Sequence, residues 1–468
     1  MKTPILLLLF SLSLNILAES TYDIIPFGEN GKFKMLYDRR SGQQALQKGD
    51  KIYIVYNGNS ERSEKGVKND KAKPLFISYD LKKGTFSSAV PLGKADSDHH
   101  FSPVLWMDNN ERLHVYHGCH KTPGTHLLSK DNKASAWLKT AALSESVSYP
   151  TVYNIANGKQ LMYFRHSGHR GAWTYRISAD EGKSWQGPKN FVTDMNMGDD
   201  LTDKAPEEMD EMSSYQSTAL SKDGKTLHVV FSHYDDNKSG IPEKFYNPRY
   251  GSKKNLGIKF NLYYVKINLE NEQVSNFAGE TLKTPIDLKA ANEHCKIWDT
   301  DHRGAGIPAQ VYLDENDRPS FLHVLTEDSP EECNYYYVSF ENGKWRQTLI
   351  CKSGHEWNCA CMYKEDGVLN AYLLTGARLN SFMDKHGGGK IEKWTSSDQG
   401  RSWVKKHDVF SKESPYANWR FNNIKPLVDA RGNVRKGMFI FYGWNENKST
   451  AKAFLMIDKS ITTLPENN

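Results

Sequence analysis

The chain has 468 residues, a formal net charge of +5, 38% hydrophobic residues and 12% aromatic residues. This length is compatible with one large domain or with two or three ordinary ones. The positive excess is too small to indicate a nucleic-acid-binding surface, so we expect no nucleic-acid partner. The aromatic content, together with 34 Gly and 18 Pro, favours an all-β protein rich in turns over a helical one.

The N-terminal residues have the pattern of a secretory signal. Lys2 is followed by an apolar run of about a dozen residues, and Ala18 stands at a suitable cleavage point. We therefore predict a signal peptide over residues 1–18 and a secreted mature protein, extracellular or periplasmic, over residues 19–468. The apolar run is too short to span a bilayer and no other segment is long enough, so we expect no membrane span.

One unit recurs along the chain: an apolar strand, a tight polar turn, and a second strand rich in aliphatic and aromatic residues. Alternating apolar residues around Asn, Asp and Gly are hairpin signals. Seven such hairpins begin at Ala45, Val104, Thr151, Thr218, Gln310, Cys361 and Pro426. Each unit is somewhat longer than a typical four-stranded blade, and we assign the excess to residues 236–301. The repeat predicts a seven-bladed β-propeller forming a single domain, with six or eight blades as the alternative.

Two segments fit the pattern S-x-D-x-G-x-x-W, the Asp-box of neuraminidase-type repeats. They are SADEGKSW, starting at Ser178, and SSDQGRSW, starting at Ser396. In this pattern Asp and Ser bond the turn backbone, Gly allows a positive φ, and Trp packs beneath the hairpin. Both segments therefore indicate the fold and carry no chemistry.

The order of strands within a blade places chemically active residues on one rim. If each hairpin supplies the first two strands of a blade, residues just after the second strand and just before the next blade share that rim. His100, His120, Tyr149 and Arg165 occupy such positions. The same rule gives further candidates, namely His99, His117, His166, His169, Tyr215, His233, Tyr234, His302, Arg303, Trp357, Arg378 and Trp444.

This combination of side chains suits proton abstraction better than glycoside hydrolysis, which needs two positioned carboxyl groups. In a β-elimination on a uronic acid, a bidentate Arg neutralises the carboxylate, a base removes the C5 proton, and an acid protonates the leaving oxygen at C4. Asp98, Asp235 and Glu327 lie near the rim but form no obvious pair.

The motifs DHHFSP, LHVYHGCH, YPTVYNIANGKQLMYFRHSG and NLYYVK resemble the propeller-type ulvan lyases of polysaccharide lyase families 24 and 25. The resemblance spans most of the mature chain. It implies that His100, His120 and Tyr149 are catalytic and that Arg165 neutralises the carboxylate. It also implies cleavage of ulvan, an anionic sulfated polysaccharide, by β-elimination. His99 is an extra residue, and His100 is preferred because it keeps the H-x-x-P spacing.

The resemblance further implies a tyrosine from a later blade. Tyr215 and Tyr246 are the candidates, and Arg249 beside Tyr246 would bind sulfate or carboxylate. Arg303, in the Gly-rich segment TDHRGAG, is another candidate for holding the sulfated chain. Each candidate also has a structural interpretation: a hydrogen-bonding histidine, an arginine in a salt bridge, or a tyrosine packed between blades.

Five of the six cysteines cluster late in the sequence, among several histidines. The blade order brings His302, Cys333, Cys351 and Cys359 to one rim, where they would form a closed, structural tetrahedral zinc site. A disulfide between two of them, or one involving Cys295 or Cys361, is the alternative, because export permits disulfides. No organic cofactor is expected.

Two other classes of function stay open. A sialidase-like hydrolase would need an arginine triad, a tyrosine nucleophile with an acidic partner, and an aspartic acid; no early arginine motif supplies the first member of the triad. A non-enzymatic glycan-binding propeller would use the same aromatic and basic rim without needing both His100 and His120. A propeller of this size can bury its core alone, so a monomer is expected.

Overall fold

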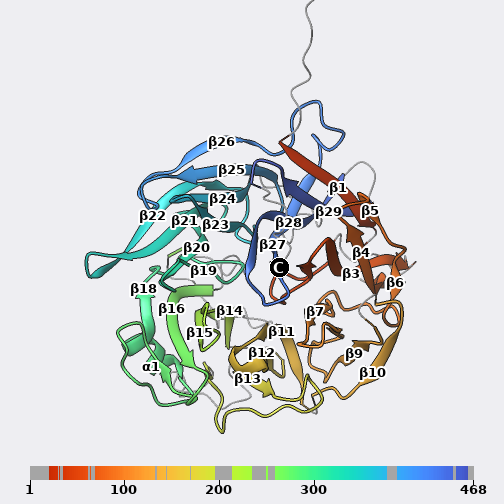
Figure 1. Cartoon of the computed structure of the whole chain (residues 1–468). Helices are drawn as coiled ribbons and strands as arrows, with labels where there is room; N and C mark the ends of the chain where they lie inside the picture. The colour runs from red at the N-terminus through yellow and green to blue at the C-terminus, as the bar shows by residue number, and fades with distance from the viewer. Residues whose placement is uncertain are drawn as a thin grey trace, which may run out of the picture.

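The computed structural model is an almost entirely β-stranded protein (Figure 1). It describes residues 21–29, 31, 35–61, 64, 69–131, 134–143, 145–168, 170–195, 213–234, 249–250, 259–376, 387–445 and 450–461. The helical segments within these ranges are short: η2 (Ala156–Gly158), α1 (Leu288–Ala290) and η4 (Ala291–Cys295).

The strands form antiparallel sheets that follow one another along the chain. The first group is β2 (Ala45–Lys48), β3 (Lys51–Glu61), β4 (Lys71–Asp80), β5 (Thr85–Phe86) and β6 (Val90–Pro91). The next is β7 (Val104–Met107), β8 (Leu113–His117), β9 (Thr125–Ser129) and β10 (Trp137–Thr140). The third is β11 (Val147–Asn154), β12 (Gln160–His166) and β13 (Trp173–Ser178).

The later groups repeat this order. They are β14 (Ser213–Leu220), β15 (Thr226–Tyr234), β16 (Lys259–Asn268), β17 (Val274–Ser275) and β18 (Lys296–Trp298); then β19 (Gln310–Leu313), β20 (Pro319–Thr326), β21 (Cys333–Glu341) and β22 (Lys344–Ser353). These are followed by β23 (Cys361–Glu365), β24 (Val368–Thr375), β25 (Lys390–Ser396) and β26 (Val404–Asp408).

The two ends of the described chain meet in one sheet. β1 (Tyr22–Glu29) pairs antiparallel with β29 (Thr450–Asp458), which continues through β28 (Val434–Asn445) to β27 (Arg420–Asp429). β27 also pairs with β2, in parallel, over only two residue pairs. This short parallel contact joins a group of four strands and a group of five strands into the nine-stranded sheet.

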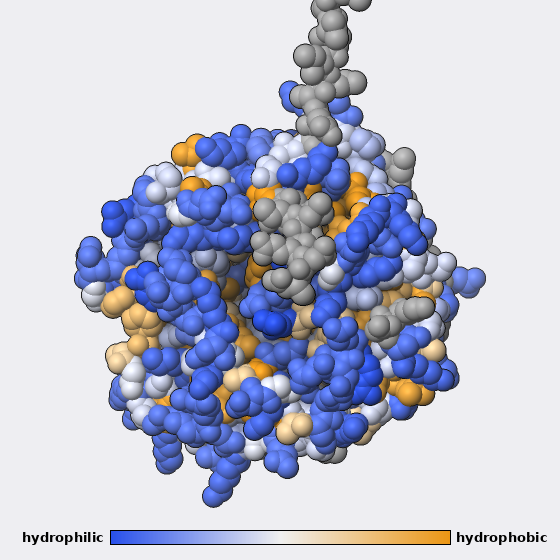
Figure 2. All heavy atoms as spheres, viewed as in Figure 1, coloured by the Kyte–Doolittle hydropathy of each residue, from blue (hydrophilic) through white to orange (hydrophobic). Residues whose placement is uncertain are grey.

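The sheets are arranged radially around a common axis, as in a β-propeller (Figure 1). All seven hairpins predicted from the sequence are present as the first two strands of their groups. The described residues of segment 236–301, which is predicted to hold the excess length, include β16, β17 and β18 of one sheet. In the view of Figure 2, hydrophilic residues cover most of the visible face, and apolar residues are seen within its hollowed centre.

Apolar side chains fill the space between neighbouring sheets. Val55 on β3, Leu105 on β7 and Val115 on β8 are buried in one cluster, which explains why the hairpin strands are apolar on both faces. Burial between successive sheets therefore fixes their order around the axis and, with it, the residues at each strand end.

The Asp-box turns form as expected. Asp180 accepts hydrogen bonds from the Ser178 hydroxyl (2.8 Å) and from the Ser184 amide (2.8 Å). The tryptophan at the end of each box packs against the preceding sheet: Trp185 lies 6.4 Å from Trp106, and Trp403 lies 5.6 Å from Tyr337, between ring centroids. The boxes thus connect adjacent sheets as well as closing their own turns.

Candidate active site

A carboxylate and two imidazoles form a compact cluster in loops flanking the sheet of β7 and β8. The Oδ1 atom of Asp98 lies 2.6 Å from Nδ1 of His100, and its Oδ2 atom lies 2.7 Å from Nδ1 of His120. The two imidazole rings are 4.1 Å apart between centroids. The His99 ring lies beside that of His100, tilted by 36° at a centroid distance of 3.8 Å.

Tyr149 lies beside this cluster because β11 is irregular at that point. The pairing of β11 with β12 shifts between Ser148 and Thr151, and Tyr149 has a φ of 57°. A tyrosine rarely adopts this left-handed backbone conformation, and such strain is found where a side chain must be aimed at a site. The Tyr149 ring is 5.8 Å from both His100 and His120 and 5.7 Å from Tyr215 on β14.

Arg165, near the end of β12, is fully buried beside both tyrosines. Its Cζ atom lies 4.8 Å from the centroid of Tyr149 and 5.0 Å from that of Tyr215. None of its three guanidinium nitrogens has a hydrogen-bond partner among the residues that the structure describes. A buried, unpaired cation is costly, so this guanidinium is suited to receiving an anionic group.

Arg40 is a second guanidinium at the site that the sequence analysis missed. Its Cζ atom lies 4.4 Å from the Tyr149 centroid, and its Nη1 lies 3.4 Å from the Tyr215 hydroxyl oxygen. It is bound to the buried Asp38 through Nε (2.9 Å) and Nη2 (2.6 Å). Because Asp38 already satisfies this charge, Arg40 acts on the tyrosines and is not free to bind a carboxylate.

Lys259, at the start of β16, is another cation that the sequence analysis missed. Its ammonium group is buried and lies 4.8 Å from the ring centroid of Tyr215, 4.9 Å from Tyr234 and 4.6 Å from Trp357. Three positive groups therefore surround Tyr215.

These charges give the two tyrosines opposite acidities. Burial acts to raise the pKa of Tyr215, but the positive charges of Arg165, Arg40 and Lys259 outweigh it and lower the pKa to about 7. Burial dominates at Tyr149 and raises its pKa well above the usual value. The site thus pairs an acidic phenol with a phenol that stays protonated at neutral pH.

The acid–base state of the imidazole cluster follows from the same balance. Burial lowers the pKa of His100 to about 4, against the opposing effect of the hydrogen bond to Asp98. Burial acts to raise the pKa of Asp98, but the hydrogen bonds from His100 and His120 prevail and lower it. Near neutral pH the cluster therefore contains a carboxylate and a neutral His100.

Asp98, His100 and His120 are the one group of three or more metal-ligating side chains that lie close together within the described part of the chain. The carboxylate oxygens are already hydrogen-bonded to both Nδ1 atoms, so this donor set is satisfied internally. The four predicted zinc ligands, His302, Cys333, Cys351 and Cys359, do not form such a group.

The predicted zinc ligands face different surroundings. Cys333 and Cys351 belong to the apolar cluster around Tyr335. Cys359 accepts a hydrogen bond from Nε2 of Gln310 (2.9 Å), and His302 packs on Phe260 at 5.9 Å between centroids. The structure therefore does not bring the four together. No disulfide links any of the six cysteines, all of which lie in the described ranges.

The other predicted substrate-binding residues lie apart from the histidine cluster. Arg303 contacts Glu327 (3.4 Å) and the Tyr336 hydroxyl (3.3 Å). Arg249 forms ion pairs with Asp301 and Asp328, each at 2.5 Å. These arginines are bound to carboxylates of the later sheets, and Tyr246, like His169 and Arg378, lies outside the described residues.

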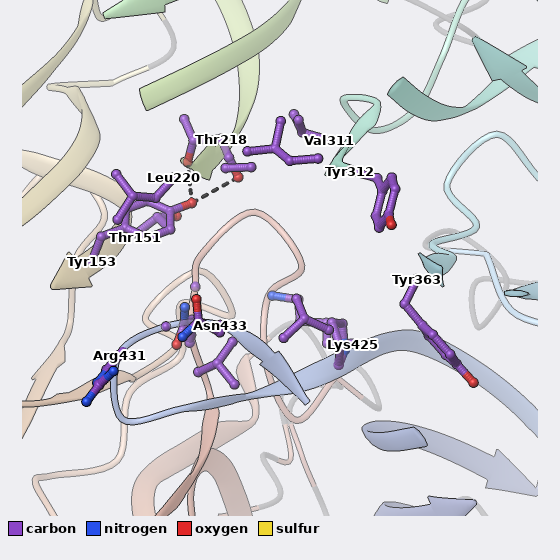
Figure 3. A pocket seen from close by; sticks show the side chains of 18 of the residues that line it. Thr151, Tyr153, Thr218, Leu220, Val311, Tyr312, Tyr363, Lys425, Arg431 and Asn433 are labelled. Atoms are coloured by element: carbon purple, nitrogen blue, oxygen red, sulfur yellow. Dashed lines mark hydrogen bonds between the residues drawn. The ribbon is translucent and has the colours of Figure 1, made fainter. Parts of the chain in front are cut away.

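A central cavity of about 1180 Å³ runs along the axis between the first strands of the sheets. Figure 3 shows Tyr153, Tyr312, Tyr363 and Lys425 around it. Arg40 and Gln216 line it, whereas His100, His120 and Arg165 do not. The cavity therefore adjoins the tyrosine–arginine cluster at Arg40 and does not include the histidines or Arg165.

Arg40 could have been predicted from the sequence, because residues just before a hairpin are expected on the same rim as the other candidates. Arg40 stands in YDRRSG, just before the first predicted hairpin, which is the position that places a residue on the active rim. Lys259 gave no such signal, because the strand that carries it was assigned to an insertion.

Comparison with known proteins gives a consistent family. A model described as "BNR repeat-containing family member" matches residues 69–353. An ulvan lyase of Alteromonas sp. (strain LOR) is 23% identical over 267 residues, covering 53% of this chain and 51% of that protein. An ulvan lyase of Nonlabens ulvanivorans is 22% identical over 403 residues, 77% of each chain. The chain spans about half the length of the Alteromonas relative and of an ulvan lyase (PL25) of Pseudoalteromonas sp. (strain PLSV).

Solved structures agree on the fold. A polysaccharide lyase described as a PL25 ulvan lyase superposes with a TM-score of 0.69 at 18% identity, covering 93% of this chain and 96% of that one. A second structure, of a PL25 ulvan lyase bound to -[GlcA(1-4)Rha3S]-, gives the same TM-score and coverage at 16% identity. At these identities the likeness establishes the architecture alone.

Proposed function

On the premise that the chain belongs to the BNR repeat-containing family, we propose that it is a polysaccharide lyase that cleaves ulvan by β-elimination. The observation that carries this proposal is the buried guanidinium of Arg165, unpaired among the described residues and in contact with Tyr149 and Tyr215. Near it lie two imidazoles, so a neutraliser, a base and an acid are available within one cluster.

The reaction follows from these groups. When a uronate carboxylate binds Arg165, its negative charge is neutralised. The pKa of the C5 proton then falls, so a side-chain base can remove this proton. The electrons of the C5–H bond form the C4=C5 double bond while the C4–O4 bond breaks. A side-chain acid then protonates O4. Proton transfer and loss of the leaving group are redox-neutral, so the reaction needs no organic cofactor.

Ulvan is the substrate favoured by the comparisons. Three curated relatives from different bacteria are ulvan lyases, and a neighbouring PL25 structure holds a glucuronate–sulfated rhamnose unit. The cationic centre formed by Arg165 and Lys259 is suited to an anionic, sulfated polymer.

The rival functions fit the site less well. A sialidase needs three arginines around one carboxylate, but Arg40 is already bound to Asp38. A purely glycan-binding propeller would not require the imidazole pair held by Asp98 or the strained backbone of Tyr149. Both features are typical of catalytic groups.

We infer further that the nine-stranded sheet counts as two blades, which makes a single domain of seven. The leader predicted over residues 1–18 supports export, which suits an extracellular polymer. Among the described residues no helix is long and apolar enough to cross a membrane. We propose that the protein acts as a monomer.

The test is to incubate the protein with ulvan, alginate and pectin and to follow the ultraviolet absorbance of the C4=C5 double bond. We expect absorbance to rise with ulvan only. Release of reducing ends without that absorbance would contradict elimination and indicate hydrolysis. Binding of ulvan without any cleavage would indicate the non-enzymatic alternative.

A further inference from the structure

Asp98 binds the same nitrogen of two different imidazoles. Its two oxygens lie 2.6 and 2.7 Å from Nδ1 of His100 and Nδ1 of His120, and Oδ1 also accepts the backbone amide of His100 (2.9 Å). The loop is held in turn by Asp96, whose Oδ1 accepts the amide of Asp98 (2.7 Å). The carboxylate is therefore fixed between the rings by its own loop.

A carboxylate can only accept hydrogen bonds, so both Nδ1 atoms must donate to it. In a neutral imidazole the other nitrogen, Nε2, then carries a lone pair and no proton. We propose that Asp98 is a positioning residue that holds His100 and His120 with Nε2 unprotonated, which makes this pair the base of the elimination and leaves Tyr149 as the acid. This inference rests on the proposed function.

The proton balance is complete with these groups. The C5 proton passes to Nε2 of one imidazole, whose second N–H remains bonded to Asp98, and the resulting imidazolium is stabilised by that carboxylate. The Tyr149 hydroxyl gives its proton to O4 as the C4–O4 bond breaks. Return of the proton from the imidazolium to the tyrosinate through solvent restores the resting enzyme.

Tyr149 is suited to the acid role by its position. Its ring lies 5.8 Å from both imidazoles, so base and acid face the same small volume. The guanidinium groups of Arg40 and Arg165, 4.4 and 4.8 Å from its centroid, would stabilise the tyrosinate formed on proton donation. The titratable and charged groups acting on His100 are Asp98, Arg40, His120 and Asp38, and of these Asp98 is the one hydrogen-bonded to both imidazole rings.

The test is the variant Asp98→Asn, examined by ¹⁵N NMR of histidine-labelled protein and by kinetics on ulvan. An asparagine offers one oxygen and one NH₂ group, so the ring facing the NH₂ must accept at Nδ1 and move its proton to Nε2. We expect kcat to fall by about 10²–10⁴-fold, as for a triad whose histidine is in the wrong tautomer, with KM changed by less than about threefold. The matched control is Asp96→Asn, which removes a carboxylate two residues away, keeps an oxygen to accept the Asp98 amide, and should leave kcat and both tautomers unchanged.

In the wild-type protein, both rings should show the Nδ1–H tautomer, assigned with the single variants His100→Gln and His120→Gln. The acid limb of the kcat/KM profile should show activity lost as His100 is protonated. In Asp98→Asn that limb should move to lower pH, because an imidazolium loses its neighbouring negative charge.

Several results would overturn the inference: an Nε2–H tautomer in the wild type, unchanged tautomers in Asp98→Asn, or activity that rises as His100 is protonated. The spectra require no substrate. A wild-type protein that yields no unsaturated product would thus refute the proposed function, while the spectra would still decide the role of Asp98 in fixing the tautomers.

Discussion

The guanidinium groups of Arg40 and Arg165 both lie within 5 Å of the Tyr149 ring, with Cζ–centroid distances of 4.4 and 4.8 Å. Their partners differ. Arg40 is held by two hydrogen bonds to the buried carboxylate of Asp38, whereas the nitrogens of Arg165 have no partner in the described part of the chain. The two arginines therefore differ in how far their charge is compensated, although both contact the same ring.

The variants Arg165→Met and Arg40→Met should accordingly change stability in opposite directions. Removing Arg165 eliminates a buried, uncompensated charge, so we expect stability to be unchanged or higher by about 1–3 kcal/mol. Removing Arg40 leaves the buried carboxylate of Asp38 without its cationic partner and should lower the free energy of unfolding by about 3–5 kcal/mol. Urea denaturation measures both.

Activity should respond differently from stability in these two variants. Arg165→Met should lose elimination activity by about 10³-fold or more, because the uronate carboxylate is no longer neutralised. An Arg165 variant that unfolds at clearly lower urea while keeping its activity would identify this arginine as a structural residue instead.

Tyr215 should ionise close to neutral pH. Although burial opposes ionisation, Arg165, Arg40 and Lys259 lower the pKa of this phenol to about 7, so the phenolate forms as the pH rises through that value. Ultraviolet difference spectra should show one tyrosinate appearing with this midpoint and should not show it in Tyr215→Phe. In Lys259→Met the midpoint should move to higher pH, since one stabilising cation is lost. An unchanged midpoint would show that Lys259 does not act on this phenol.

His323 should make the fold sensitive to acid. It is buried on β20, its ring nitrogens have no hydrogen-bond partner among the described residues, and burial, aided by Arg303, lowers its pKa to about 3. Between that value and the ordinary 6.5, the unfolded chain binds a proton that the folded protein does not. The contribution of this histidine therefore destabilises the fold as the pH drops below 6.5.

Replacement of His323 by Phe should remove this contribution. We expect the variant to gain more in melting temperature over the wild type at pH 5 than at pH 8, with both values measured by thermal unfolding. An equal difference at the two values of pH would mean that His323 is not a source of acid sensitivity.

Gly400 of the second Asp-box should be intolerant of a side chain. Its φ is 82°, and a Cβ atom would lie 2.1 Å from the Tyr337 ring of the preceding sheet. Gly343 has a similar φ of 77° but no atom within 4 Å of such a Cβ. Gly343→Ala should therefore cost only the backbone strain, about 1–2 kcal/mol, and Gly400→Ala a further amount of about 1–3 kcal/mol from overpacking. Equal losses would show that Tyr337 moves aside freely, and kcat should stay unchanged in both variants.

Much of the fold could be predicted because its signals are local. The hairpins at Ala45, Val104 and the later repeats are each indicated by a polar turn between two apolar strands. The register of these strands determines which residues lie on one rim. That logic correctly brought His100, His120, Tyr149 and Arg165, from different strands and loops, into one cluster together with Tyr215.

The features that were not predicted depend on three-dimensional pairing. The choice of Asp98 as the common partner of two imidazoles depends on the loop conformation, and the neutralisation of Arg40 by Asp38 depends on side-chain rotamers. The cysteines were misleading for the opposite reason. The blade order placed the predicted zinc ligands on one rim, but Cys333 packs in the core between sheets, whereas Cys359 accepts a hydrogen bond from Gln310.

The pairing of β1 with β29 has a consequence for the order of events during synthesis. Tyr22 lies opposite Asp458, so the first strand of the described chain has no partner until the last one has left the ribosome. Until then the sheet that contains both ends of the described chain is incomplete, and the ring of sheets is not closed. The sheet that joins the two ends of the described chain can therefore form only after synthesis of β29 is complete.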